Sequence, residues 1–375
     1  MKRRAFIKFS TLAVTACTMG HSLSSFAENT HIGNVVVILC RGGLDGVSAV
    51  QPKTQRLKEI REDCYINSTL KLTQEFDLHP KLINFKSHWD KHNAAAVHAT
   101  GFSYSGRSHF DGQNIMEVGS YKPYTMSTGW LGRAMELKNL SSLALNLPTP
   151  IIAKSLAPNS NFYPSKLITP QYEDALAIKK LWASDPVLSG YTSDTTTSAM
   201  NRSSSRKASR LAEKMAQEMS LDGGPKVGFI EYSGFDTHSQ QGSENGHQAR
   251  YIAEVDQIIK AFSQNSSKEV WAKTLMVTVT EFGRTIYQNG SRGTDHGNAS
   301  AILMAGGLIK QRQVVTDWPG LEDKDLFEGR DLRQTIDARD VYGDILHHAF
   351  DISKAQIRDV IFPGSKQNLD LGIWG

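Results

Sequence analysis

Cysteine is scarce in this chain, with three among its 375 residues. Cys17 lies near the N-terminus, which leaves Cys40 and Cys64 for the rest of the chain. These two could pair in an oxidising compartment, but Cys40 ends an apolar run, which favours a buried thiol. Two cysteines make no disulfide framework, so a fold held together by disulfides is excluded.

Long hydrophobic runs and an excess of charge are missing too. A helix that spans a bilayer needs roughly 20 apolar residues, and the N-terminal stretch Phe9–Ala16 is far shorter. The 42 basic residues exceed the 38 acidic ones by four, and residues 1–27 hold four basic and no acidic residues. The rest of the chain is therefore neutral, which argues against a basic face for nucleic acid. We expect neither a transmembrane segment in the mature chain nor a nucleic-acid partner.

The first 27 residues have the layout of an export signal. A positive region precedes the short apolar stretch and consists of Lys2, Arg3, Arg4 and Lys8. The Arg3-Arg4 pair is close to the twin-arginine pattern, so we expect the twin-arginine translocase as a partner and a periplasmic location. Cleavage after Ala27 would leave residues 28–375. Two alternatives stay open: a lipid anchor on Cys17, because Val14–Cys17 resembles a lipobox, and a cytosolic protein with a basic first helix.

Short runs of β-branched and other apolar residues recur along the rest of the chain. They show no clean alternation with polar residues, which is typical of strands buried on both faces of a parallel sheet. The runs are Val35–Leu39, Ala94–His98, Val227–Tyr232, Leu275–Val279 and Ala301–Ala305, with Pro150–Ala153 as a weaker one. Apolar residues at helical spacing lie between them, at Leu211, Met215 and Met219 and again within residues 251–262. This alternation predicts a doubly wound α/β fold with a mainly parallel sheet and helices on both faces.

Residues 184–206 have a different composition. Their second half, Thr192–Arg206, is rich in serine and threonine and has almost nothing to bury. Such a segment predicts a flexible surface excursion and not a domain boundary. We therefore expect residues 28–375 to form one domain.

Chemistry-bearing residues follow or flank the predicted strands. In open α/β sheets, ligands bind outside the carboxyl ends of the strands. The candidate metal ligands at these points are Asp45, Asp236, His238, Asp295 and His296. Three carboxylates and two imidazoles suit zinc or manganese. Each motif also has a structural interpretation, because Asp45-Gly46 can form a turn and Asp236 with His238 can cap a helix and fill a surface position.

Ser108 stands between a predicted strand and a predicted helix. With Asp111 three residues later, it fits the form of a capping box, so it can be a structural N-cap. The start of a helix also favours a bound anion, and a serine there can act as a nucleophile toward an ester. Arg107 and His109 flank it. The spacing leaves both roles open.

Seven motifs occur in order within residues 33–364. They are Arg41–Gly46, Val97–Gly101, Ser105–Asp111, Gly129–Arg133, Asp236–His238, Thr280–Arg284 and Gly293–Gly297. This series resembles a bacterial family catalogued as domain of unknown function 1501, many of whose members carry twin-arginine signals. The family is grouped with the alkaline phosphatase-like superfamily of phosphatases, sulfatases and phosphomutases. The resemblance implies an alkaline phosphatase-like fold and a metal-dependent hydrolase.

The resemblance also implies roles for single residues. Ser108 is similar to the superfamily's nucleophile at a helix start. The implied metal ligands are Asp45 after the first strand, the pair Asp236 and His238, and the pair Asp295 and His296.

Two features depart from the superfamily's pattern. Asp236 and His238 are two residues apart, whereas the alkaline phosphatases space this pair four apart. The alkaline phosphatases also use a histidine late in their chains. After His296 this chain has only His347 and His348, and their segment Val341–Phe350 has the periodicity of a packed helix. One metal site is then incomplete, or is completed by another residue. The candidates for that position are Glu281, His98 and His109.

These observations predict an exported hydrolase of phosphate or sulfate esters that uses zinc or manganese. Ser108 would attack the ester, with Arg107 or Arg284 holding the non-bridging oxygens and His109 beside them. The substrate would be a small molecule or a polymer that carries the ester. The alternative is a non-catalytic exported protein that binds a partner or assembles at the surface, and the altered ligand spacing favours it.

Replacing Arg3 and Arg4 by lysine should hold the precursor inside the cell, because the export receptor reads the arginine pair as an address. Fractionation of cells that express the variant measures this. Mature protein in the periplasm at the wild-type level would contradict it. The N-terminus of the wild-type protein decides the processing: Glu28 supports cleavage after Ala27, and a lipid on Cys17 supports the lipobox.

Overall fold

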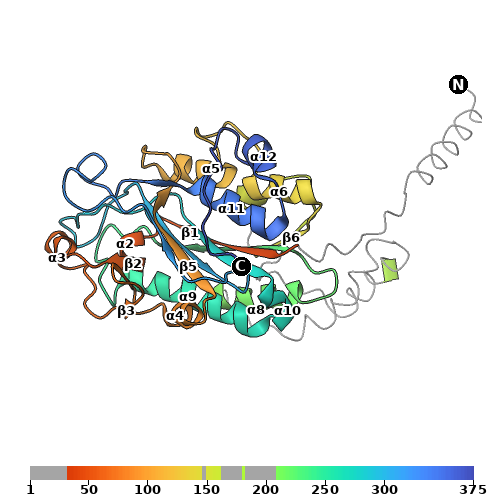
Figure 1. The fold of residues 1–375 in the computed structure, drawn as a ribbon, viewed down its shortest axis with the longest axis horizontal. Helices are drawn as coiled ribbons and strands as arrows, with labels where there is room; N and C mark the ends of the chain where they lie inside the picture. Colours follow the sequence, from red (N-terminus) through yellow and green to blue (C-terminus); the bar gives the residue numbers. More distant parts are fainter. Residues whose placement is uncertain (1–31, 146–148, 162–179, 182–207) are drawn as a thin grey trace, which may run out of the picture. The chain divides into compact units, whose positions relative to one another are not determined.

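Five of the six predicted runs form strands of one central sheet (Figure 1). The computed structural model describes residues 32–145, 149–161, 180–181 and 208–375. Contacts group Gly33–Gly375 into one unit, and the fold is that of this unit. The predicted signal in residues 1–27 and the predicted excursion 184–206 lie outside the described residues.

The sheet is mainly parallel, as the sequence predicts. Within the described residues it has nine strands in the order β11-β5-β10-β9-β1-β8-β6-β7, with β12 paired to β5. Their bounds are β1 Asn34–Arg41, β5 Ala94–Gly101, β6 Ser142–Leu145, β7 Asn159–Asn161, β8 Val227–Ser233, β9 Thr274–Val279, β10 Ser300–Ala305, β11 Val314–Val315 and β12 Ile336–Asp337. β1 pairs in parallel with β8 and β9, whereas β10 runs antiparallel to both β5 and β9. β2 (Val50–Pro52), β4 (Phe76–Leu78) and β3 (Leu70–Lys71) form a small antiparallel sheet.

Helices cover both faces of the central sheet (Figure 1). One face carries α4 (Ile83–Asp90), α8 (Ala208–Met219), α9 (His247–Asn265) and α10 (Lys268–Ala272). The other carries α5 (His109–Val118), α6 (Trp130–Lys138), α11 (Ala338–Phe350) and α12 (Lys354–Gln356). The short helices α2 (Gly46–Ala49) and α3 (Gln55–Ile60) follow β1 and β2. No helix in the described ranges is both long and apolar enough to cross a bilayer.

The middle strand β1 is buried on both of its faces. Its apolar residues from Val35 to Leu39 are at most 1% exposed, which explains the absence of alternation in the sequence. Val36, Ile38 and Cys40 belong to the same hydrophobic core as the inner side of α8. Leu211, Met215 and Met219 form that inner side, so the helical spacing predicted this packing.

The weaker run, Pro150–Ala153, is not a strand. Ile151–Ala153 forms a turn of 3-10 helix, η1. Pro150 has no N–H to donate to a strand ladder, and the segment packs against the start of α6. There the N–H of Gly129 donates to the carbonyl of Lys154 at 3.0 Å, and a Cβ at Gly129 would lie 2.1 Å from the carbonyl oxygen of Ile152.

Both described cysteines are free thiols, as the apolar context of Cys40 favours. Cys40 is 0% exposed and Cys64 is 2% exposed. Burial raises the pKa of Cys64 to about 11 and raises the pKa of Cys40 as well. Buried thiols of this kind stay protonated and unreactive at neutral pH.

Candidate metal centre

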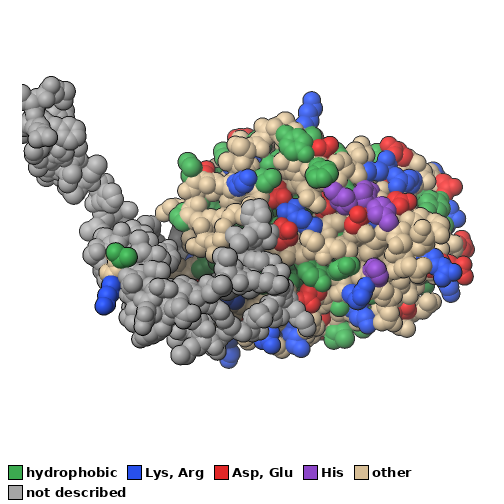
Figure 2. Space-filling model, turned by 180° about the vertical axis from the view of Figure 1, so that it is seen from behind, with side chains coloured by type: hydrophobic (Ala, Val, Ile, Leu, Met, Phe, Trp, Pro, Cys, Tyr) green, Lys and Arg blue, Asp and Glu red, His purple; other side chains and the backbone are tan. Residues whose placement is uncertain are grey.

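The chemistry-bearing residues gather at one edge of the sheet. β1, β8 and β9 end there together, because Arg41 pairs with Ser233 and Leu39 with Val279. The antiparallel β10 begins at this edge, so residues just before it also reach the edge. The residues delivered there are Asp236 and His238 after β8, Glu281 and Arg284 after β9, and Asp295 and His296 before β10. Figure 2 shows histidine side chains gathered on one face of the molecule among acidic and basic ones.

Asp236 is the meeting point of three histidines. Nε2 of His238 lies 2.9 Å from Oδ1 of Asp236, and Nε2 of His296 lies 3.0 Å from the same oxygen. Nε2 of His109, the first residue of α5, lies 3.3 Å from Oδ2 of Asp236. The ligand atoms of His109, Asp236 and His296 all lie within 4.8 Å of one another.

Each of these imidazoles is held at its other nitrogen, Nδ1, by an oxygen acceptor. The acceptors are Oε1 of Glu281 for His109 at 2.9 Å, Oδ1 of Asp295 for His238 at 2.9 Å, and the carbonyl of Arg107 for His296 at 2.8 Å. An acceptor at Nδ1 places the proton there and leaves the lone pair on Nε2. Metal-binding histidines are oriented in this way in proteins.

Two of the ring nitrogens at the centre lie close to each other. Nε2 of His238 and Nε2 of His296 lie 3.0 Å apart, and both nitrogens face the carboxylate of Asp236. Two lone pairs at this distance repel each other unless a cation, either a proton or a metal ion, lies between them.

The donor atoms fit a transition-metal ion. Zinc bonds of 2.0–2.1 Å in a tetrahedral arrangement place the donor atoms about 3.3 Å apart, close to the distances of 2.9 to 3.3 Å between the Nε2 atoms and the Asp236 oxygens. In the described part of the chain, Nε2 of His109 is buried and has no hydrogen-bond partner. A set of imidazoles and a carboxylate is the borderline chemistry that zinc and manganese accept.

Arg284 keeps Asp236 ionised. Its Nη1 donates to Oδ1 of Asp236 at 2.8 Å, and its guanidinium is 1% exposed. Burial alone would raise the pKa of Asp236, but the hydrogen bond and charge of Arg284 hold this pKa below its usual value. Asp236 is therefore an anionic donor at neutral pH.

Glu281 holds His109 in place. It is 1% exposed and also accepts from the N–H of Gly42 at 2.8 Å and from Nε2 of Gln113 at 3.1 Å. The hydrogen bond from His109 to Glu281 raises the pKa of His109 against the effect of burial. Burial opposes ionisation of Glu281 itself, and this hydrogen bond lowers the pKa of Glu281. The sequence offers Glu281 as a metal ligand, and in the structure its Oε1 accepts a hydrogen bond from the ring of His109.

Asp45 does not join the group around Asp236. It is 0% exposed, and its Oδ2 accepts from Arg61 at 2.6 Å, Ser48 at 2.7 Å and Gln241 at 2.7 Å. Arg61 is itself 1% exposed, so this is a buried ion pair that neutralises the carboxylate. The ion pair and the hydrogen bonds all use Oδ2, whereas Oδ1 is buried without a hydrogen-bond partner among the described residues.

Ser108 is the N-cap of α5. Its Oγ accepts from the N–H of Asp111 at 3.5 Å, and its own N–H donates to Oη of Tyr104 at 3.2 Å. The full capping box is not formed, because no bond returns from Asp111. Both neighbours of Ser108 touch the centre, Arg107 through its carbonyl and His109 through its ring.

The two arginines that could hold a substrate have internal partners. Arg107 pairs with Asp331 at 2.7 Å and with Glu328 at 2.5 Å. Arg284 uses Nε and Nη2 on Thr294 as well as Nη1 on Asp236. Arg284 therefore positions Asp236, whereas the side chain of Arg107 pairs with two carboxylates that are not among the candidate ligands.

The other histidines considered for the centre lie elsewhere. His98 is 0% exposed and its Nε2 contacts the carbonyl of Val50 at 2.8 Å. His347 and His348 lie in the last turn of α11, as the packed-helix periodicity predicts. Of the three candidates for the open position, His109 is the one whose ring nitrogen faces Asp236. Two polar neighbours have no sequence signal of their own: Gln113 on Glu281, and Asn289, whose Nδ2 donates to Asp295 at 3.0 Å.

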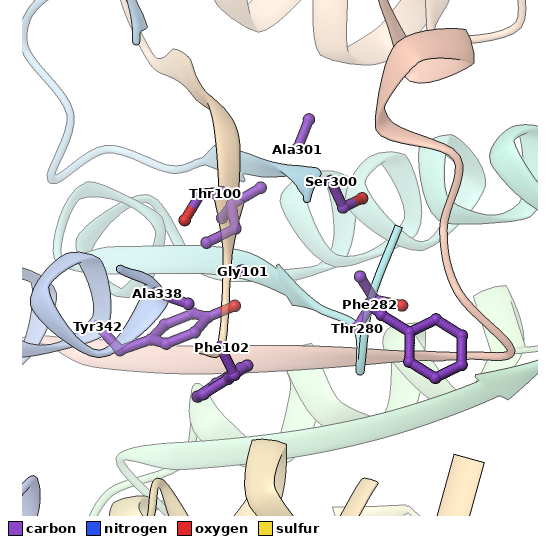
Figure 3. Close-up of a pocket in the computed structure, with 10 residues that line it drawn as sticks. Thr100, Gly101, Phe102, Thr280, Phe282, Ser300, Ala301, Ala338 and Tyr342 are labelled. Atoms are coloured by element: carbon purple, nitrogen blue, oxygen red, sulfur yellow. The ribbon is translucent and has the colours of Figure 1, made fainter. Parts of the chain in front are cut away.

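Figure 3 shows the residues that line a small cavity, among them Phe282, whose ring packs against His109 and His296. The cavity is lined by Thr100, Phe102, Thr280, Phe282 and Tyr342, among others, and has a volume of about 10 Å³, enough for about one water molecule. Oγ1 of Thr100 is buried there without a partner among the described residues.

Comparison with known proteins connects the chain to one family. The family described as "Protein of unknown function (DUF1501)" matches residues 165–361, which confirms the resemblance drawn from the motifs. No curated protein matches the chain.

Several solved structures are similar at low identity. One is Ps i-CgsB in complex with k-i-k-neocarrahexaose, with 10% identity, 87% of this chain and 74% of that chain covered, and a TM-score of 0.42. Another is a protein in the alkaline phosphatase superfamily from Vibrio parahaemolyticus, with 13% identity, 76% and 62% coverage, and a TM-score of 0.36. A third is murine ectonucleotide pyrophosphatase/phosphodiesterase 5 in complex with AMP, with 10% identity, 86% and 96% coverage, and a TM-score of 0.36.

The buried Asp45–Arg61 ion pair should contribute to the stability of the fold in a pH-dependent way. Burial would raise the pKa of Asp45, but Arg61 lowers it, so the pair's contribution is present above the ordinary pKa of about 4 and is lost as the pH falls through the folded-state value. Arg61→Met should lower the free energy of unfolding by about 3–5 kcal/mol at pH 7. Its cost should be smaller at pH 5, because the unpaired Asp45 then takes up a proton more easily.

Urea unfolding at the two pH values measures this. Asp45→Asn added to Arg61→Met is the matched control, and it should recover part of the loss because no buried charge remains. A loss below about 1 kcal/mol in Arg61→Met at pH 7, the value of an exposed pair, would contradict the structural role.

Proposed function

The chain belongs to the DUF1501 family, and from that premise we propose that it is an exported, metal-dependent hydrolase of phosphate or sulfate esters that works in the periplasm. One observation carries the proposal: three imidazoles, each held at Nδ1, direct Nε2 toward the ionised Asp236. Asp236, His296 and His109 would hold the metal, zinc or manganese, with His238 beside them. Glu281 and Asp295 would keep two of the rings in place.

The residues around the centre suit attack on an anionic ester. A divalent ion there would polarise an ester oxygen and lower the pKa of an attacking hydroxyl. Ser108 supplies a hydroxyl one residue away from His109. The ten-residue α5 begins at His109, and free N–H groups at the start of a helix favour an anion such as the ester's non-bridging oxygens. Oγ of Ser108 would bond to phosphorus or sulfur as the bond to the ester oxygen breaks, and water would later release the acid.

One observation favours the alternative, a non-catalytic exported binding or surface-assembly protein. Arg284 uses its three nitrogens on Asp236, Gly42 and Thr294, and Asp45 is neutralised by Arg61. The site therefore has fewer free cationic groups and fewer free carboxylates than the motifs imply. Metal binding and turnover separate the two functions.

Removing two donors should empty the centre. We expect Asp236→Asn with His296→Ala to lower the zinc or manganese content by one equivalent per chain, because the remaining donors are too few for a closed or catalytic site. Asparagine still accepts the hydrogen bond of Arg284, so the fold should persist. His347→Ala, on α11, is the control and should keep the wild-type content. Elemental analysis of metal-loaded, desalted protein measures it, and an unchanged content in the double variant would refute the centre.

Substitutions at Ser108 separate its two roles. If Ser108 is only an N-cap, Ser108→Ala should cost about 0.5–2 kcal/mol and Ser108→Gly a few tenths, with turnover nearly unchanged. If Ser108 is the nucleophile, as we propose, both variants should lose turnover of any ester that the wild type hydrolyses, whatever their melting temperatures. Ser108→Thr should keep the cap and some turnover. Near-wild-type rates for Ser108→Ala would exclude the nucleophile and move the attack to water.

A further inference from the structure

A second group of possible metal ligands joins α11 to the C-terminal segment. Asp344 and His348 lie one helical turn apart on α11, and Asp370 belongs to the segment that follows α12 and the π-helical turn Ile357–Ile361. One ligand atom from each of Asp344, His348 and Asp370 lies within 4.8 Å of the other two. Residues at positions i and i+4 share one face of a helix, so α11 presents an aspartate and a histidine to the same point.

Asp344 is the buried member of this group. Its side chain is 1% exposed, and its Oδ2 accepts from the N–H of Leu371 at 3.1 Å and from Nε1 of Trp374 at 2.8 Å. Its other oxygen, Oδ1, is buried and has no hydrogen-bond partner within the described ranges. The facing group is Nε2 of His348 at 3.7 Å, too far for a hydrogen bond. A buried carboxylate oxygen without a donor is uncommon, and a bound ion or an ordered water molecule accounts for one.

We propose that Asp344, His348 and Asp370 bind one divalent metal ion, with zinc as the best match. Two carboxylates and one imidazole are a set that zinc accepts, with solvent in the remaining position. His348 and Asp370 are exposed, so an ion can enter from solvent and water can complete its shell. The ion would bind Oδ1 of Asp344, because both hydrogen bonds to this carboxylate are made to Oδ2.

This site is separate from the centre at Asp236. The last turn of α11 lies beside the beginning of β1, because the N–H of Gly33 donates to the carbonyl of Ala349 at 2.6 Å. The centre at Asp236 lies beyond the other end of β1. The two sites are thus at opposite edges of the sheet, and this proposal does not depend on the proposed function.

The ion would fasten the C-terminal segment to the helix. That segment already packs on α11: Leu371 and Ile373 are at most 1% exposed, and the ring of Trp374 stacks on His348 with centroids 4.7 Å apart. A metal bound across Asp370 and α11 stabilises this docked form, because it binds the folded state only. The site would therefore be structural and not catalytic.

Zinc titration of the full chain by calorimetry tests the proposal. In a background of Asp236→Asn with His296→Ala, which lacks the first centre, we expect one zinc per chain to remain bound. Asp370→Asn added to that background should weaken this binding by at least about tenfold, since even indirect support of a ligand is worth about 10–100-fold. Asparagine keeps the acceptor that Gly372 uses at 2.9 Å, so folding should be unaffected.

His347→Ala is the matched control. Its Nδ1 donates to the carbonyl of Ile352 at 2.8 Å and takes no part in the group, so zinc binding should not change. His348→Ala should act as Asp370→Asn does, and zinc should raise the melting temperature of the background protein but not of these two variants. If the background does not fold, Asp370→Asn in the wild type should lower the zinc content by one equivalent. No zinc bound in the background, or binding insensitive to both substitutions, would overturn the site whatever the fate of the first centre.

Discussion

The arrangement of the site depends on one carboxylate, that of Asp236. It receives the buried guanidinium of Arg284 and faces three imidazoles, and the loops around it are shaped to allow this. Gly42 has a φ of +113°, and a Cβ there would lie 2.5 Å from the N–H nitrogen of Asp236. A side chain at that position would displace Asp236. The close approach of the loop after β8 therefore requires a glycine after β1. The position of Asp236 depends on how these two loops pack at the edge of the sheet.

Much of the architecture could be predicted from local sequence. Runs such as Val35–Leu39 have the continuous apolar character of strands covered on both faces, and the spacing at Leu211, Met215 and Met219 fixed a helical face. The direction of β10 could not be predicted, because an apolar run carries no information on whether its neighbours are parallel. The prediction of a strand at Pro150–Ala153 was wrong, because four apolar residues are too few to distinguish a strand from a helical turn.

The convergence of several predicted residues could be foreseen from the sequence, whereas their contacts could not. Asp236, His238 and His296 converge, as their positions at the strand ends suggest. The motif at Asp45 looks the same whether or not Arg61 reaches it, since the partner comes from a different loop. The role of Glu281 depends on His109, 172 positions away in the chain. Such partners meet only in the folded chain. Local sequence patterns therefore indicate which residues can donate to a metal, but they do not distinguish a metal ligand from a residue that orients a ligand.

In the function that we propose, Asp236, His109 and His296 surround a metal ion. The most direct measurement is anomalous diffraction from wild-type crystals grown with zinc, with data collected on both sides of the zinc absorption edge. The account predicts a zinc peak about 2.0–2.2 Å from an oxygen of Asp236 and from Nε2 of His296. Well-ordered side chains at this edge of the sheet with no zinc peak between them would contradict it, and a proton shared by the imidazoles would then hold the cluster together.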